Sequence, residues 1–282
     1  MPVRWHLQTP LPGVPACDLN PTLFVELLLI GLCTGFLAGL LGLGGGMVMV
    51  PLLTIILNAR GYPSEYTVKM AIATSLATIC FTSLSSVRAH HQRGAVLWPV
   101  ARMLAPGILV GAFLGSQVAT ALPQRLLGLL FAGFVVFSAT QMLLNRRPKP
   151  SRTLPGTAGM FGMGGVIGSL SALVGAGGAF VSVPFMTWCN VAIHKAVGTS
   201  SALGFPIAFA GTVGYLIAGW NLPSMPAGAV GYLYWPGLAV LSITSMATAP
   251  FGARVSHSMD IAPLKKAFAI VLYGVAIYFV LR

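Results

Sequence analysis

Two glycine-rich runs of similar sequence contain the residues of this chain best suited to hold a ligand. Gly42–Pro51 reads GLGGGMVMVP, and Gly175–Pro184 reads GAGGAFVSVP. Each run lies in an apolar stretch, where a glycine inside a helix costs about 1 kcal/mol relative to alanine. Broken backbone is tolerated inside a bilayer only where its N–H and C=O groups face protein or a wet cavity. Paired interruptions in the two halves of a membrane protein point to the site where a substrate binds.

The chemistry that these runs offer is the binding of an anion. A helix that begins after such a break has free N–H groups and about half a positive charge at its N-terminus. Two such ends that face each other could hold an anion without a buried lysine. We therefore expect the backbone of these residues to line the site: Gly44, Gly45, Gly46, Gly177, Gly178 and Ala179. The alternative is that the small residues only permit close helix crossing.

Hydroxyl groups follow each glycine run at similar positions. Thr74 and Ser75 follow the first run, and Thr199 and Ser200 follow the second. Their hydroxyls could donate hydrogen bonds to an oxyanion, so we expect these four residues to bind the substrate. The alternative is that they are ordinary packing residues, as serine and threonine often are in membrane helices.

Two prolines and two lysines accompany these motifs. Pro51 and Pro184 close the glycine runs, and we expect them to fix where the short helices end or bend. Lys69 and Lys195 each stand near the start of the next segment, where they could draw anions toward the site. The alternative for the lysines is that they reach to the membrane interface and do no more.

Acidic residues are too few, and too far from mid-membrane, to support a metal or proton-relay site. The four are Asp18, Glu26, Glu65 and Asp260, and all lie in the N-terminal stretch, in loops or near segment ends. The four cysteines show no metal-ligand spacing, so no metal and no cofactor is expected. The pair His90-His91 is interpreted as part of a hydrated loop. No HExxH or GxSxG motif is present, so an intramembrane enzyme is disfavoured and no catalytic residue is assigned.

Composition places the chain in a membrane. Of its 282 residues 56% are hydrophobic and only 7% are charged, whereas soluble domains carry roughly 25% charged residues. The net charge of +12 is spread over short loops between apolar runs, which is typical of topology signals and not of a nucleic-acid-binding face. The expected partners are therefore the lipid bilayer and a small anion, without nucleic acid, and the oligomeric state stays open.

The apolar segments form two sets. The first comprises 22–41, 47–58, 67–88, 97–121 and 125–144, and the second comprises 157–174, 179–190, 196–219, 229–250 and 264–281. A full crossing needs about 20 residues, so we expect the short pieces 47–58 and 179–190 to return as the second arms of hairpins.

Several landmarks recur in the same order in both sets, which indicates an internal duplication. Besides the glycine runs and the Thr-Ser pairs, Trp98-Pro99 corresponds to Trp235-Pro236. If each glycine run is a hairpin, each half has five segments and the second half is inverted. Most basic residues then share one side, which the positive-inside rule assigns to the cytoplasm.

At these residues the chain resembles the sulfite exporter TauE/SafE family of multi-pass bacterial transporters. The resemblance rests on both glycine–proline runs, on His194–Ser200, and on His91–Gly94 shortly before Trp98. It covers roughly residues 22–282 and implies movement of sulfite, sulfoacetate or similar sulfonates across the cytoplasmic membrane. It also implies that the glycine runs and the Thr-Ser pairs line the path. The second run departs from the family's commonest form, because Ala179 replaces the third glycine.

The sequence therefore predicts an all-α integral membrane protein of two inverted repeats, each a glycine-broken hairpin plus three transmembrane helices. Its expected divisions are an irregular arm (1–21), a first repeat (22–144), a basic cytoplasmic linker (145–156) and a second repeat (157–282). The expected function is transport of a small anion, which the resemblance implies is sulfite or an organosulfonate. A passive anion channel, and an assembly protein without transport, are the alternatives.

Overall fold

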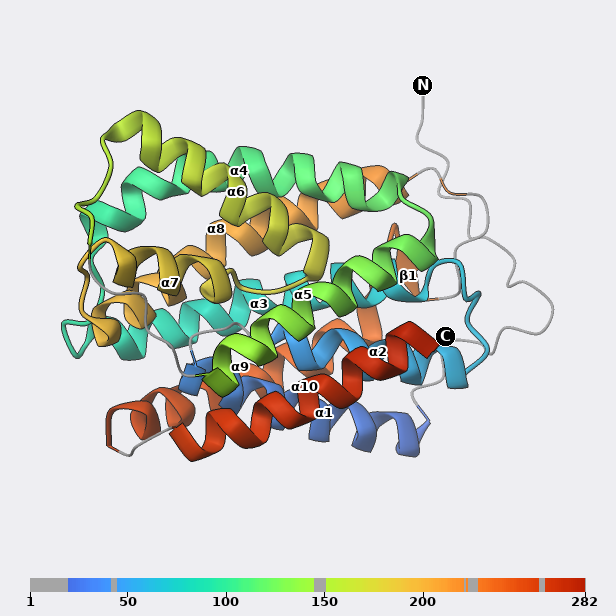
Figure 1. Ribbon diagram of the computed structural model, residues 1–282. Coiled ribbons are helices and arrows are strands. Elements are labelled where there is room, and N and C mark those ends of the chain that lie inside the picture. Colours follow the sequence, from blue (N-terminus) through green and yellow to red (C-terminus); the bar gives the residue numbers. More distant parts are fainter. Residues whose placement is uncertain are drawn as a thin grey trace, which may run out of the picture.

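The computed structural model describes residues 20–41, 45–144, 151–220, 222, 228–258 and 262–281. Over these ranges the fold is helical, apart from one short hairpin of two strands (Figure 1). The helices are α1 (Pro21–Leu41), α2 (Gly46–Ala59), α3 (Thr67–His91), α4 (Trp98–Ala121), α5 (Gln124–Leu144), α6 (Thr157–Val174), α7 (Ala179–Trp188), α8 (Ile193–Gly219), α9 (Trp235–Ser258) and α10 (Ala262–Leu281). Most of the expected arm, residues 1–19, and residues 145–150 of the expected linker lie outside the described ranges.

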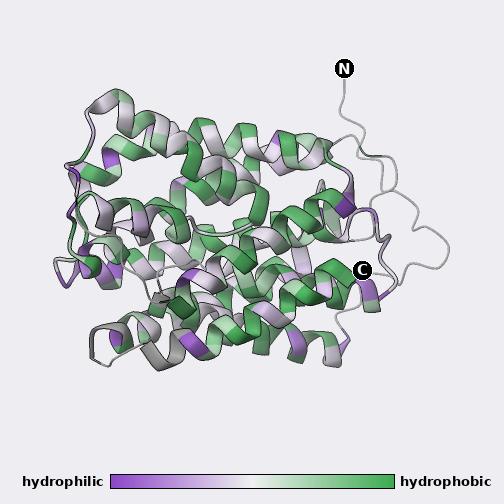
Figure 2. Cartoon of the chain, viewed as in Figure 1, coloured by the Kyte–Doolittle hydropathy of each residue, from purple (hydrophilic) through white to green (hydrophobic). Residues whose placement is uncertain are grey.

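The helices lie side by side between two ends of the molecule. In Figure 1 the α3–α4 and α7–α8 links lie at the left end, and the α2–α3 and α4–α5 links lie at the right end. Hydrophobic residues dominate the length of the bundle, and hydrophilic residues gather mostly toward its ends (Figure 2). Seven of the described helices, α1, α3, α4, α5, α6, α8 and α9, are long and apolar enough to cross a membrane.

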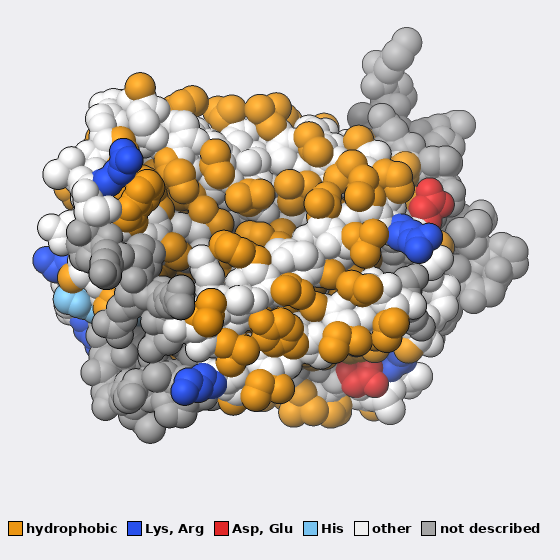
Figure 3. All heavy atoms as spheres, in the orientation of Figure 1, with side chains coloured by type: hydrophobic (Ala, Val, Ile, Leu, Met, Phe, Trp, Pro, Cys, Tyr) orange, Lys and Arg blue, Asp and Glu red, His pale blue; other side chains and the backbone are white. Residues whose placement is uncertain are grey.

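Large apolar side chains cover the visible side of the bundle between the two ends (Figure 3). Ile243 is 73% exposed and Ile270 is 67% exposed. A protein surrounded by water would bury such side chains, but hydrocarbon accepts them at no cost. The exposed apolar belt therefore faces lipid.

Small residues bring two pairs of helices close together. Glycines spaced four apart on α1 meet α9, and glycines spaced four apart on α4 meet α6. A Cβ atom added to any of them would lie within 3 Å of the partner helix. Such spacing lets membrane helices pack by close backbone approach. The residues are Gly31, Gly35 and Gly39 on α1, and Gly107, Gly111 and Gly115 on α4.

One expected segment is wrong at its start. The apolar run 229–250 begins with strands β1 (Ala229–Val230) and β2 (Leu233–Tyr234), and α9 starts only at Trp235. Gly231 lies between the strands with φ of +57°, which favours a turn over a helix. The pair His90-His91 also differs from expectation, because both residues belong to α3 and His90 is fully buried.

Candidate functional site

The two glycine runs place the starts of two short helices inside the bundle. Gly45 precedes α2 with φ of +71°, and Gly178 precedes α7 with φ of +78°. Both values lie in the left-handed region, which is strained for residues with a side chain. A Cβ on Gly45 would lie 2.5 Å from the carbonyl oxygen of Thr34, in the middle of α1. The glycines therefore let each helix begin beside its preceding neighbour. Gly44 lies outside the described residues.

The two breaks lie next to each other. A Cβ on Gly46 would lie 1.9 Å from the carbonyl oxygen of Gly175, so the start of α2 touches the end of α6. The hydroxyl of Ser75 donates a hydrogen bond to that same carbonyl at 3.0 Å. The sequence predicted that the starts of the two short helices face each other, and the observed contact joins the start of α2 to Gly175, at the end of α6. Gly45 and Gly46, the described residues of the first break, are both buried.

Thr74 and Thr199 each accept a hydrogen bond from the backbone of the opposite half, at corresponding positions. The amide of Tyr234, just before α9, donates to Thr74 Oγ1 at 3.0 Å. The amide of Leu97, just before α4, donates to Thr199 Oγ1 at 2.9 Å. Each threonine thus satisfies a backbone N–H group that precedes a helix of the other half.

We expect Thr74→Val to lower the free energy of unfolding by about 1 to 3 kcal/mol, because it leaves the buried amide of Tyr234 without its acceptor. Thr74→Ser keeps the hydroxyl and should stay close to the wild-type thermal midpoint. The two midpoints are measured by following unfolding of the purified protein on heating. Equal midpoints for the valine and serine variants would contradict a structural role for this hydroxyl.

A cavity lies at the second break. Its walls come from α1, α3, α8 and the link before α7, and the lining residues are Ala38, Thr82, Ser83, Ser86, Gly177, Ser200, Ser201 and Gly204. The space in it that a water molecule can occupy is about 10 Å³. We call it the hydroxyl cavity, because five of these eight residues carry a hydroxyl and none carries a charge. The fold thus brings Gly177 and Ser200, both expected site residues, to one polar space.

The N-terminus of α7 adds backbone donors beside this cavity. The first amides of a helix have no acceptor within it, and those of Ala179 and Phe180 belong to that first turn. Ser182, in the next part of α7, donates to the hydroxyl of Ser200 at 2.8 Å. The other lining hydroxyls donate to protein oxygens, whereas Ser200 accepts its bond. An acceptor oxygen in the cavity would therefore meet the Ser200 hydroxyl and the partial positive charge of the helix start.

Sequence reasoning missed the contribution of α3. Thr82, Ser83 and Ser86 are buried and line the hydroxyl cavity, with Thr78 one turn before them. Thr82 is hydrogen-bonded to Ser245 of α9 at 2.7 Å, which fixes α3 against α9. Hydroxyls at positions i and i+4 in an otherwise apolar helix were the available signal, since such residues share one face.

The two lysines occupy different environments. Lys69 is buried in the first turn of α3, and its ammonium donates to the carbonyl oxygen of Thr120, near the end of α4, at 2.7 Å. That contact ties a cation to the C-terminal end of a helix, where positive charge is favoured. Lys195 is exposed in the first turn of α8. Neither lysine lines the hydroxyl cavity.

Tyrosines pack together near Lys69. The ring of Tyr232 lies 6.2 Å from those of Tyr66 and Tyr215, and Tyr62 lies 5.8 Å from Tyr234. Burial, with Tyr66 and Glu65 nearby, raises the pKa of the Tyr232 phenol, so this group stays neutral at physiological pH. These aromatic side chains fill the end of the bundle where α3 begins and α8 ends.

Pro51 and Pro184 do not end the short helices. Pro51 lies inside α2, which continues to Ala59, and Pro184 lies inside α7, which continues to Trp188. Each proline leaves one carbonyl of the preceding turn without its helical donor. The interruption of the chain therefore lies at the glycines that precede each helix.

Metal-binding groups are not assembled in the part of the chain that the structure describes. No set of three or more His, Cys, Asp or Glu side chains lies close enough together there to hold an ion. The polar chemistry of the described site is that of hydroxyls and backbone amides.

Comparisons with known proteins agree with this architecture. The sequence model of the family described as Sulfite exporter TauE/SafE matches residues 27–279. A probable membrane transporter protein of Haemophilus influenzae is 35% identical over 93% of this chain and 99% of its own length. Similar proteins of Bacillus subtilis and Methanocaldococcus jannaschii, also named probable membrane transporter proteins, are 27% and 26% identical over 86% and 83% of this chain and 94% and 86% of their own lengths. No solved structure matches the chain.

The matching residues run from α1 to α10, so they include both glycine breaks and every lining residue of the hydroxyl cavity. The names of the relatives describe membrane transporters and no enzyme. The apolar helices and the exposed apolar belt agree with a multi-pass protein of the cell membrane. The chain is a membrane transporter and belongs to the sulfite exporter TauE/SafE family.

Proposed function

We propose that this transporter moves a small anion, sulfite or an organosulfonate such as sulfoacetate, through the hydroxyl cavity. The observation that carries the proposal is the composition of the cavity wall, in which hydroxyls and the link before α7 meet without any carboxylate. Such a wall offers donors to an oxyanion and no counter-charge that a transported cation would need. The choice of sulfur oxyanions rests on the family that the chain belongs to.

In this proposal the substrate contacts come from the second break. Gly177, Gly178 and Ala179 present the start of α7, and Ser200 presents its hydroxyl. The first break has a structural role in this proposal, because Gly45 packs against Thr34 of α1 and Gly46 packs against Gly175. Thr74, Ser75 and Thr199 support the surrounding backbone through their hydrogen bonds.

We further propose that 22–144 and 157–282 are inverted repeats. When α1–α5 are matched in order with α6–α10, the packed pair α1 and α9 corresponds to the packed pair α6 and α4. In the same way, the pair α3 and α9 corresponds to the pair α8 and α4. The Thr74 to Tyr234 hydrogen bond likewise corresponds to the Thr199 to Leu97 bond. In Figure 1, α3 ends at the left end of the bundle whereas α8 begins there, so the two run in opposite directions.

The end of the bundle that carries the α3–α4 link is proposed to face the cytoplasm. Most of the basic residues in the described ranges lie at this end, as the positive-inside rule requires. They are Arg88, Arg93, Arg102, Arg152, Lys195, Arg254, Lys265 and Lys266, against Arg60, Lys69 and Arg125 at the other end. A reporter enzyme fused at Ser151 is expected to lie on the cytoplasmic side of the membrane. A reporter found on the outer side would contradict this orientation.

Transport is tested with the purified protein in liposomes. We expect saturable uptake of labelled sulfite, and accumulation against its gradient when a proton or sodium gradient is imposed. The hydroxyl cavity has a volume accessible to water of only about 10 Å³, enough for about one molecule. That narrow space favours a transporter that must change shape over a passive channel. Flux that only follows the anion gradient, without saturation, would instead identify a channel.

Ser200→Ala is the variant that tests the cavity itself. Removing one hydroxyl donor to a charged ligand costs about 1.5 to 3 kcal/mol, so we expect the apparent affinity for sulfite to fall by roughly 10- to 100-fold. Ser169→Ala, which changes a half-buried serine of α6 outside the cavity, is the matched control and should keep wild-type affinity. Equal affinities for both variants would remove Ser200 from the binding site.

A further inference from the structure

A second polar hollow lies at the ends of α3 and α9. Its lining residues are Ser85, Arg88, Ala89, Gln92, Arg93, Pro250 and Arg254, and we call it the arginine mouth. The space in it that water molecules can occupy is many times larger than that of the hydroxyl cavity. In Figure 1 both helices end at the left end of the bundle, so the mouth opens where the proposed cytoplasmic side lies.

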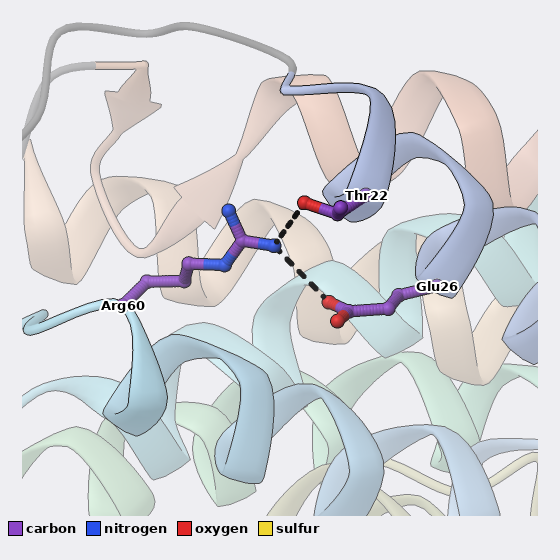
Figure 4. A network of polar contacts seen from close by, with 3 residues as sticks. All are labelled: Thr22, Glu26 and Arg60. Carbon is purple, nitrogen blue, oxygen red and sulfur yellow. Dashed lines mark hydrogen bonds and ion pairs between the residues drawn. The ribbon is translucent and has the colours of Figure 1, made fainter.

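The mouth carries a concentrated positive charge. Three guanidinium groups from two helices and one link line a single hollow, and no lining residue is acidic. Arg88, Arg93 and Arg254 are all exposed at this end. The acidic Glu26 lies at the opposite end, where its carboxylate accepts from Arg60 at 3.3 Å (Figure 4). A hollow lined by positive charges and low-dielectric walls raises the local concentration of anions.

The donors of the mouth suit an oxyanion better than a simple halide. One N–H of Arg93 donates to the carbonyl oxygen of Ala253 at 3.0 Å, which fixes the side chain across α9. A guanidinium has five N–H donors, so others stay available to the hollow. Gln92 adds an amide. Planar guanidinium forks bind oxyanions through paired hydrogen bonds, which a spherical ion cannot accept in the same way.

Consecutive residues of α3 connect the mouth to the hydroxyl cavity. Ser85 lines the mouth and donates to the carbonyl oxygen of Met246 at 3.0 Å. Ser86 lines the hydroxyl cavity and donates to Ser201 at 3.4 Å. The two spaces therefore border the same turn of α3, on the sides that face α9 and α8.

We propose that the arginine mouth is a separate binding site for a small oxyanion at the proposed cytoplasmic end, where the substrate is held next to the hydroxyl cavity. The assignment of its ligand as the transported anion rests on the proposed function. The guanidinium groups of the mouth are exposed. An anion can therefore bind there whether or not the hydroxyl cavity is open.

The test measures sulfite binding to the full-length protein in neutral detergent and in phosphatidylcholine nanodiscs, at constant ionic strength kept with chloride. We expect Arg88→Gln to weaken binding about tenfold, because one charge-assisted donor pair is lost. Arg88→Lys should weaken it less, since the charge remains while the fork is lost. Arg125→Gln, an exposed arginine at the opposite end, is the control and should bind as the wild type. An Arg88→Gln protein with wild-type affinity would overturn the proposal.

A second variant separates this site from the transport path. Gly204→Leu fills the hydroxyl cavity and should abolish transport, while Arg88-dependent sulfite binding persists within about threefold of the wild-type value. Loss of that binding in Gly204→Leu would show that the mouth is no independent site and would overturn the proposal. If the wild-type protein transports no anion yet binds sulfite through Arg88, the proposed function fails and the mouth stands as an anion site.

Lipid phosphate is the other source of an oxyanion at this end. Native mass spectrometry of protein extracted from phosphatidylglycerol-containing membranes counts the lipids that stay bound. We expect wild type and Arg88→Gln to retain the same number. Fewer retained lipids in Arg88→Gln, together with sulfite binding that does not depend on Arg88, would assign the mouth to lipid headgroups and overturn the assignment to a free anion.

Discussion

Replacing Gly46 with alanine is expected to abolish transport and to lower the free energy of unfolding by about 3 kcal/mol or more. The added Cβ would lie 1.9 Å from the carbonyl oxygen of Gly175 and 2.9 Å from the hydroxyl of Ser75. The carbonyl belongs to the backbone of the second break and cannot rotate away as a side-chain end could. Overpacking of a fitted interior costs 1 to 3 kcal/mol, and more where backbone must move. The hydrogen bond from Ser75 to Gly175 would be displaced as well.

The measurements are the thermal midpoint of the purified protein and sulfite flux in liposomes. A loss of about 3 kcal/mol corresponds to roughly 5 to 10 °C in the midpoint for a protein of this size. Gly133→Ala is the matched control, because no atom lies within 4 Å of the added Cβ and α5 gains helix propensity. A Gly46→Ala protein with wild-type midpoint and flux would contradict the close contact of the two breaks.

Ala179 is the counterpart of Gly46 in the second run. It occupies the position in the second run that Gly46 occupies in the first, and it already carries a Cβ. We expect Ala179→Gly to cost only about 1 kcal/mol or less, from the difference in helix propensity. The two runs should therefore differ in how well this position tolerates a methyl group, and the thermal midpoints of the two variants measure that difference.

Gly204→Leu is expected to stop sulfite flux, reducing it to about a tenth of the wild-type rate or less, while the protein still folds. Its Cβ would lie 3.2 Å from the Cβ of Ser83 and 3.9 Å from Ile79 Cγ2, so the backbone of α8 need move only slightly. The remaining leucine atoms extend into the hydroxyl cavity, which Gly204 lines. Its water-accessible volume is only about 10 Å³, so the cavity cannot hold both leucine and an anion.

Two variants complete that experiment. Gly133→Leu introduces the same side chain where nothing lies within 4 Å, and should leave flux unchanged. Gly204→Ala adds a single carbon and should give an intermediate rate. The thermal midpoint and the elution volume show whether each protein is folded. A folded Gly204→Leu protein that transports sulfite at the wild-type rate would place the path elsewhere.

The amino-acid sequence could predict most helices because hydropathy and glycine act locally. Nine of the ten expected apolar segments correspond closely to observed helices. The tenth, 229–250, begins with a strand hairpin, because a short apolar stretch has no periodicity that separates strand from helix. The place of each break was predictable too, since Gly45 and Gly178 adopt backbone angles that strain other residues.

The role of each hydroxyl was not predictable from spacing. Thr74 and Thr199 were expected to bind the substrate, and the structure adds that their hydroxyls accept from Tyr234 and Leu97 of the opposite halves. Thr82, Ser83 and Ser86 were not among the expected site residues, and they line the hydroxyl cavity. A hydroxyl in a membrane helix has several available partners, and the sequence does not specify which of them lies within reach.

The sequence by itself determined a membrane protein with two interrupted segments, since the cost of placing apolar groups in water and the backbone freedom of glycine belong to single residues. The tertiary structure alone decided that Gly46 packs against Gly175 while Gly177 of the second break lines a cavity with five hydroxyl-bearing residues. It also decided that the arginines of α3 and α9 share one hollow. The physical reason is that these features are contacts between distant parts of the chain, and their distances are set by how the helices pack.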